Sequence, residues 1–128
     1  MPLHHFEDLE VWKRSSRLAV DILRLIEPIK LYTLKDQMAR SCISVPSNIA
    51  EDAERESNRE FRRFLAIAKG SIGELRTQLY IGLAAGVFAS ESATPLIKEA
   101  KELASMIEGL RKRLIGPGIV NKLLSIFF

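Results

Sequence analysis

Apolar residues recur at steps of three and four along most of the 128-residue chain, the spacing that places side chains on one face of an α-helix. The clearest apolar row consists of Phe61, Phe64, Leu65, Ala68, Ile72, Leu75, Leu79 and Leu83. No segment alternates apolar and polar residues with the two-residue period of a strand. We therefore predict a single all-α domain, an antiparallel up-down-up-down four-helix bundle with a short apolar C-terminal tail.

Capping residues, prolines and glycines predict four helices over about residues 6–27, 33–54, 57–86 and 94–115. The predicted starts are capping boxes of Thr33 with Asp36 and of Ser57 with Glu60, and an N-cap at Thr94 before Pro95. Pro28 is expected to end the first helix, and Pro46 to kink the second because it lacks an N–H.

The run Gly116-Pro117-Gly118 is expected to stop the fourth helix, which leaves residues 119–128 outside the bundle. This tail is mostly apolar, and a monomer rarely exposes such a patch to water. Two arrangements are open at this stage. The tail folds back onto its own bundle, or it packs on a neighbouring subunit.

A polar stripe follows one face of the second predicted helix, beside an apolar face that includes Cys42. Small hydroxyls and an amide stand between charges, which suits close packing and specific hydrogen bonds better than a solvated surface. Its members are Gln37, Arg40, Ser41, Ser44, Asn48, Glu51 and Arg55. On the third predicted helix, Gly70 and Gly73 flank Ser71 and indicate close approach of another backbone. We expect Cys42 to be a buried structural thiol.

Candidate catalytic chemistry is sparse. The two histidines, His4 and His5, precede the first helix, so no helix offers the carboxylate–histidine pair of a metal-binding bundle. Glu51 and Glu74 are the plausible acid–base candidates, and we expect them to pair with Arg40 or Arg55 instead. From the sequence we therefore expect no metal site, no cofactor and no enzymatic activity.

A basic cluster marks the start of the third predicted helix, although the net charge of the chain is only +3. Its members are Arg55, Arg59, Arg62, Arg63 and Lys69. It is either a solvated surface balanced by neighbouring glutamates or a surface that contacts phosphates. A second basic cluster, residues 111–113, lies at the end of the fourth predicted helix. The two basic clusters need not form one surface, because they can lie at opposite ends of the bundle.

The chain shows neither a secretion signal nor an apolar run long enough to cross a bilayer, so we expect a cytoplasmic protein without a membrane partner.

Three sequence blocks carry a resemblance to a known family: FEDLEVW at residues 6–12, QMARSCISVPSNIAEDAER at 37–55, and EFRRFLAIAKGSIGELRTQLYIG at 60–82. With these motifs the chain resembles the four-helix-bundle proteins encoded in intervening sequences of bacterial large-subunit ribosomal RNA genes. Relatives of that family include the accessory proteins of diversity-generating retroelements.

The resemblance implies a small antiparallel bundle that assembles into a ring, commonly a homopentamer. For the retroelement relatives it also implies a basic surface that binds nucleic acid and a partner reverse transcriptase. The family's motif positions fall on Arg40, Ser44, Asn48, Glu51, Arg55, Gly70, Ser71 and Glu74. Two functions follow as expectations: a homo-oligomer that binds structured RNA or a nucleic-acid–enzyme complex, or a protein-interaction module that docks through the apolar tail.

Overall fold

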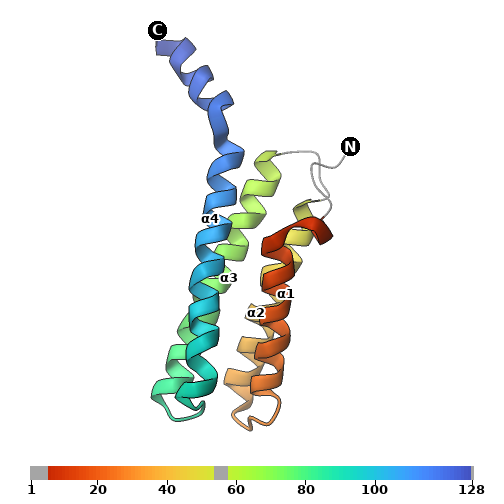
Figure 1. The fold of residues 1–128 in the computed structure, drawn as a ribbon, viewed down its shortest axis with the longest axis vertical. Helices are drawn as coiled ribbons and strands as arrows, with labels where there is room; N and C mark the ends of the chain where they lie inside the picture. Colours follow the sequence, from red (N-terminus) through yellow and green to blue (C-terminus); the bar gives the residue numbers. More distant parts are fainter. Residues whose placement is uncertain (1–5, 54–57, 128) are drawn as a thin grey trace.

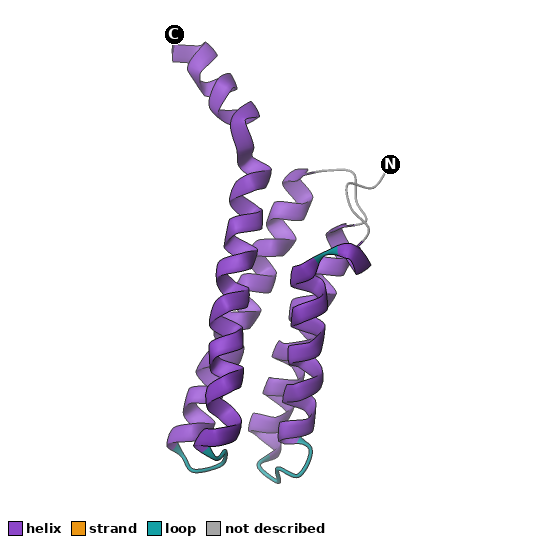
Figure 2. Ribbon diagram, viewed as in Figure 1, coloured by secondary structure: helices purple, strands orange, loops and turns teal. Residues whose placement is uncertain are grey.

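The structure is a computed structural model that describes residues 6–53 and 58–127, of which residues 52–53 and 115–127 are described by their backbone alone. After a short 3-10 turn, Phe6–Asp8, four helices follow: α1 Glu10–Ile26, α2 Tyr32–Ala53, α3 Asn58–Ala84 and α4 Ser90–Phe127. The helices run alternately up and down and pack side by side (Figure 1). The described residues contain no strand (Figure 2). The predicted all-α four-helix bundle is confirmed.

The core forms where the four apolar faces meet. On α3, the side chains of Phe61, Leu65, Ala68, Ile72, Leu75 and Leu79 are all fully buried. The apolar face of α2 contributes Met38, Cys42, Val45 and Ile49, and α4 contributes Ala100, Leu103 and Ile107. These are positions that the periodicity predicts. In α1, by contrast, Leu23 stands at helical steps from the buried Ala19 and Ile26 but is 39% exposed.

Two helices begin earlier than their capping signals predict. The amide of Lys35 donates to the carbonyl of Leu31 (3.0 Å), so the chain is already helical at Thr33. Likewise α4 begins at Ser90, and the Thr94 hydroxyl lies 3.3 Å from the Ser90 hydroxyl within the helix. Thr33 and Thr94 are therefore not caps. Ser57, the third predicted cap, lies outside the described residues.

The predicted stop at Gly116-Pro117-Gly118 is wrong, because α4 continues through it to Phe127. A proline has a φ angle suited to a helix and removes only one backbone bond, and glycine is costly in a helix without being excluded from it. The end of α4 projects beyond the other helices, so the backbone of residues 119–127 does not fold back onto the bundle (Figure 1). Pro46 also lies within an uninterrupted helix, and the kink there stays a prediction.

The turn between α3 and α4 is closed by backbone hydrogen bonds around Gly86, which has a φ of +75°. The amide of Gly86 donates to the Leu83 carbonyl (3.2 Å), and the amide of Val87 donates to the Gly82 carbonyl (2.8 Å). These two bonds, together with the left-handed conformation of Gly86, form a Schellman motif. The motif gives partners to carbonyls that a helix end otherwise leaves unpaired.

The same turn requires a second glycine. Phe88 is buried with its ring against Gly82, where an added Cβ would overlap the ring. Gly70 and Gly73, for which the sequence predicts a close backbone, have no other atom within 4 Å of an added Cβ. The close approach therefore occurs at Gly82, and the expectation for Gly70 and Gly73 is wrong within this chain.

An arginine clamp joins α1 to α4. The Arg14 Nε donates to Glu99 at 3.0 Å, a second guanidinium nitrogen also contacts Glu99, and that nitrogen donates to Glu102 at 2.6 Å. A two-pronged bond of this kind fixes geometry as well as charge. The two carboxylates raise the pKa of Arg14 above its ordinary value. The clamp adds a directional polar contact to the apolar packing of α1 and α4.

We predict that Gly82→Ala lowers the free energy of unfolding by about 1–3 kcal/mol, because the new methyl group must displace the Phe88 ring. The matched control is Gly109→Ala, in the exposed interior of α4, where an added Cβ meets no atom within 4 Å. The control is expected to raise stability by up to about 1 kcal/mol, because alanine favours helix over glycine. Urea unfolding followed by circular dichroism measures both changes, and equal changes of one sign would contradict the prediction.

Candidate functional site

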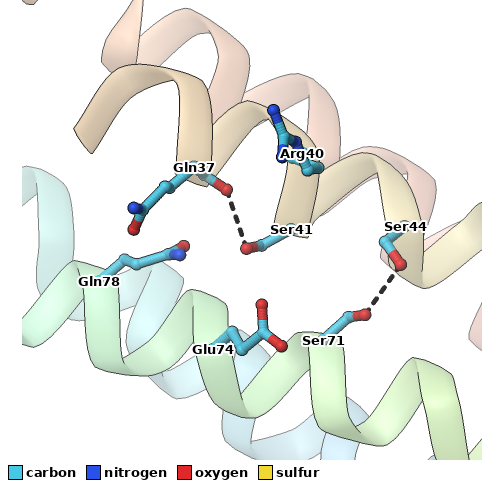
Figure 3. Close-up of a pocket in the computed structure, with 7 residues that line it drawn as sticks. All are labelled: Gln37, Arg40, Ser41, Ser44, Ser71, Glu74 and Gln78. Atoms are coloured by element: carbon cyan, nitrogen blue, oxygen red, sulfur yellow. Dashed lines mark hydrogen bonds between the residues drawn. The ribbon is translucent and has the colours of Figure 1, made fainter. Parts of the chain in front are cut away.

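A polar groove of about 320 Å³ lies between α2 and α3 (Figure 3). We call it the α2/α3 groove. Its lining consists of Gln37, Arg40, Ser41, Ser44, Ser71, Glu74 and Gln78. The structure thus brings much of the predicted polar stripe on α2 together with Ser71 and Glu74 on α3.

Hydrogen bonds between small side chains form one part of this groove. The hydroxyls of Ser44 and Ser71 lie 2.8 Å apart and link the two helices. The Asn48 amide nitrogen donates to the Ser44 hydroxyl at 2.9 Å and to the Ser44 carbonyl at 2.8 Å. The Ser41 hydroxyl donates to the Gln37 carbonyl at 2.9 Å. Because Ser41 and Ser71 are both buried, this part of the polar stripe belongs to the interior of the bundle.

The charged members of the groove are exposed. In Figure 3, Glu74 points from α3 toward α2, whereas Arg40 extends away from α3. Among the described residues Arg40 forms no ion pair, so its predicted pairing with Glu74 or Glu51 is wrong. Arg55, the other predicted partner, lies outside the described residues. The stripe is therefore divided between a buried hydrogen-bonded part and an open charged rim.

Gln78 is a member of the groove that the sequence interpretation missed. Its side chain is only 9% exposed, and within the described structure its Oε1 atom has no hydrogen-bond partner. A signal for it was available, because Ser71, Glu74 and Gln78 stand at helical steps of three and four. The polar face of α3 thus extends one turn further than the sequence interpretation placed it.

The predicted basic cluster is spread over α3. Arg59 and Arg63 are exposed, and the Arg63 guanidinium lies 5.8 Å from the centre of the Phe64 ring. Arg62 is half-buried, and its Nε has no hydrogen-bond partner in the described structure. Lys69 contacts Glu108 on α4 at 3.1 Å.

The Lys69–Glu108 contact shows that the start of α3 and the later part of α4 lie at the same end of the bundle. The possibility that the two basic clusters lie at opposite ends is thereby excluded. Glu108 also accepts from Arg111 at 2.8 Å and 3.0 Å. Arg111 and Lys69 together lower the pKa of Glu108 to about 2, and Glu108 raises the pKa of Arg111. One carboxylate is thus shared by two cations.

A second groove, of about 500 Å³, lies between α3 and α4, and we call it the α3/α4 groove. Its lining consists of Lys69, Arg76, Lys101, Ala104, Ser105, Glu108, Gly109 and Lys112. Of these, the sequence interpretation identified Lys69 as a site residue and placed Lys112 in the second basic cluster. The seven-residue step from Lys69 to Arg76 was the available signal on α3, but the contribution of Lys101 depends on how the two helices pack.

Reactive groups elsewhere are few in the described structure. Cys42 is buried, and its thiol donates to the Ala39 carbonyl at 3.4 Å. Burial raises the pKa of this thiol to about 11, so it stays protonated at neutral pH, and the predicted burial of Cys42 is confirmed. Among the described residues no three His, Cys, Asp or Glu side chains gather as a metal site requires. None of the described helices is both long and apolar enough to cross a membrane.

We predict that the Ser44 and Ser71 hydroxyls are energetically coupled. In a double-mutant cycle, Ser44→Ala and Ser71→Ala should each lower the free energy of unfolding by about 1 kcal/mol. The double variant should lose less than the sum, by about 0.5–1 kcal/mol, because each single change already breaks the shared hydrogen bond. Ser47→Ala, at an exposed position on the same helix, is the control and should change stability by less than about 0.5 kcal/mol. Strictly additive losses in urea unfolding would rule the coupling out.

Comparison with known proteins supports the sequence resemblance. The model of the 23S rRNA-intervening sequence protein family matches residues 7–109. Among solved structures, a protein of unknown function from the S23 ribosomal protein family of Bacteroides thetaiotaomicron is similar in fold, with a TM-score of 0.75 at 23% identity. That match covers 80% of this chain and 98% of the other. No curated protein matches the chain. Because the family match spans most of its length, the chain belongs to the 23S rRNA-intervening sequence protein family.

Proposed function

We propose that this protein is a non-enzymatic, homo-oligomeric helical bundle that binds structured RNA through a basic surface at one end. The observation that carries the proposal is the antiparallel pairing of α3 with α4, in which Lys69 contacts Glu108. This pairing brings the basic start of α3 beside the basic residues 111–113 of α4. Cations gathered on one surface bind the phosphate backbone without reading its sequence.

The exposed side chains on this surface suit phosphate contact. Arg59 and Arg63 lie on α3 in contact with solvent, and Lys112 and Arg113 do so on α4. None of these four has an ion-pair partner among the described residues. Their charges are therefore available to a ligand. Arg55, which the sequence adds to the cluster, lies outside the described residues.

Assembly into a ring, for which the family resemblance suggests five copies, would repeat this surface around an axis. Several modest patches on one particle bind a long RNA more tightly than one patch alone. The open rim of the α2/α3 groove is a candidate subunit contact, because exposed Ile67 and Ile81 lie on the same face of α3 as Glu74. A nucleic-acid enzyme such as a reverse transcriptase is the further candidate partner that the resemblance suggests.

The non-enzymatic part of the proposal rests on the chemistry of the α2/α3 groove. A serine nucleophile needs an adjacent base that accepts its proton. Among the described residues the hydrogen-bond partners of the Ser44 hydroxyl are the Ser71 hydroxyl and the Asn48 amide, and neither acts as a base at neutral pH; Glu74 lines the same groove but forms no hydrogen bond with Ser44. The groove is thus built for hydrogen bonding between helices and gives no support to nucleophilic catalysis.

A second candidate function is a protein-interaction module without a role in nucleic-acid binding. It is favoured by the end of α4, which projects beyond the bundle and whose sequence after Gly118 is mostly apolar. An apolar helix of this kind docks into a groove of a partner or of a neighbouring subunit.

For the leading function we predict that Arg59→Ala with Arg63→Ala weakens binding to a structured RNA hairpin by about tenfold at ~0.1 M salt and reduces the salt slope by about two. The measurement is fluorescence anisotropy over a series of salt concentrations. The control pair, Arg24→Ala with Lys30→Ala, removes the same charge near the loop between α1 and α2, at the opposite end of the bundle. Equal losses in the two pairs, or wild-type binding that does not respond to salt, would contradict the proposal.

Deletion of residues 119–128 tests the second function. If the tail only docks a partner protein, the deletion leaves the particle mass in solution unchanged but abolishes binding of that partner. If the tail joins subunits, the mass falls toward that of one 14.4 kDa chain, as measured by light scattering. We expect RNA affinity to persist per subunit in either case, because the basic surface lies outside the deleted segment. Loss of RNA binding without a change in mass would argue against the leading proposal.

A further inference from the structure

The α3/α4 groove has features that the proposed RNA-binding surface does not explain. Four cationic side chains line it against a single carboxylate, that of Glu108. Glu108 is already shared by Lys69 and by Arg111, which lies beside the groove. The remaining cations, Arg76, Lys101 and Lys112, form no ion pair among the described residues. The groove therefore keeps a strong positive field in the absence of a ligand.

The cations follow the length of the groove. Along α4, Lys101, Ser105, Glu108 and Lys112 stand at steps of four, three and four, on one helix face. At a rise of about 1.5 Å per residue, Lys101 and Lys112 are separated by about 16 Å along the helix axis. A single phosphate ion does not span that distance, whereas a chain of phosphodiesters does. On the facing side, Arg76 has a shielded Nε without a hydrogen-bond partner in the described structure.

An exposed aromatic ring stands at the edge of this groove. Tyr80 is 43% exposed and lies one helical turn beyond Arg76 on α3. Lys101 and, to a smaller extent, Arg76 lower the pKa of its phenol. Grooves that bind single-stranded nucleic acid combine these parts, a basic path for the backbone and an aromatic face on which a base stacks.

We propose that the α3/α4 groove binds a single-stranded RNA segment, whose phosphates contact the groove cations and one of whose bases stacks on Tyr80. This inference rests on the proposed RNA-binding function and adds a site and a ligand form to it. Duplex RNA is excluded from the stacking contact, because its bases already stack on one another. An acidic peptide would satisfy the cations but would leave Tyr80 without a role.

The test uses fluorescence anisotropy with the full chain and a labelled oligouridylate of about 12 nucleotides, a length within the range bound by one single-strand site. Arg76→Ala with Lys101→Ala should weaken binding by about tenfold and reduce the salt slope by about 1.4, since two phosphate contacts are lost. The control pair, Lys13→Ala with Arg24→Ala, removes the same charge from exposed positions on α1 and should reduce affinity by no more than about twofold.

Two further variants separate stacking and local charge from structural damage. Tyr80→Leu should weaken oligouridylate binding by about fivefold or more, whereas Tyr80→Phe, which keeps the ring, should retain it. Neither change should affect binding of an RNA duplex of matched length. Glu108→Gln removes the one carboxylate of the groove and should tighten oligouridylate binding, a gain that damage to the fold does not produce.

The outcomes distinguish this inference from the function on which it rests. If the chain binds RNA but the groove pair behaves like the α1 control pair, the groove assignment is wrong and the proposed function stands. If the chain binds neither oligouridylate nor the hairpin, the groove assignment and the proposed function are both wrong. A loss of duplex affinity in the groove pair as large as its loss of oligouridylate affinity, or a polyglutamate of similar length competing equally well with oligouridylate, overturns the single-strand assignment.

Discussion

The fully buried apolar row on α3 is the constraint on which the rest of the bundle depends. It runs from Phe61 to Leu79 without an exposed member, and α3 packs against both α2 and α4. Burying each large side chain of this kind contributes roughly 1.5–3 kcal/mol, so the rotation of α3 about its axis is set by this row. Once that rotation is set, it also fixes which residues on either side of the row face α2 and which face α4.

Each flank of α3 then carries a different chemistry. One flank presents Ser71, Glu74 and Gln78 to α2, and its contact across the interface is a neutral hydroxyl pair with Ser44. The other flank presents Lys69 and Arg76 to α4, and its contact across the interface is an ion pair with Glu108. The first flank bonds to α2 through the buried Ser71 hydroxyl, while Glu74 stays on the open rim of the groove. The second retains unpaired cations at its surface, which is why the proposed ligand contacts lie on that side.

Capping motifs and helix breakers predicted the helix ends less accurately than the apolar periodicity predicted the helices themselves. Thr33 and Thr94 match capping motifs, yet the chain is already helical at both, and α4 runs through Gly116-Pro117-Gly118. Capping residues and breakers shift local preferences by only about 1–3 kcal/mol, so they favour a helix end without fixing it. The turn that does reverse the chain uses Gly86 in a left-handed conformation, with Gly82 making room for Phe88.

The fold could be predicted from the sequence because helical periodicity is local: positions such as Ile72, Leu75 and Leu79 reveal their shared face without knowledge of any partner helix. The polar stripe on α2 and the basic start of α3 were recognisable for the same reason. Contacts between helices were not. Arg14 meets Glu99 across 85 residues of sequence, and Ser44 meets Ser71 across 27. Nothing local encodes the rotation and axial offset of two packed helices, so only the tertiary structure decided that Arg76 shares a groove with Lys101.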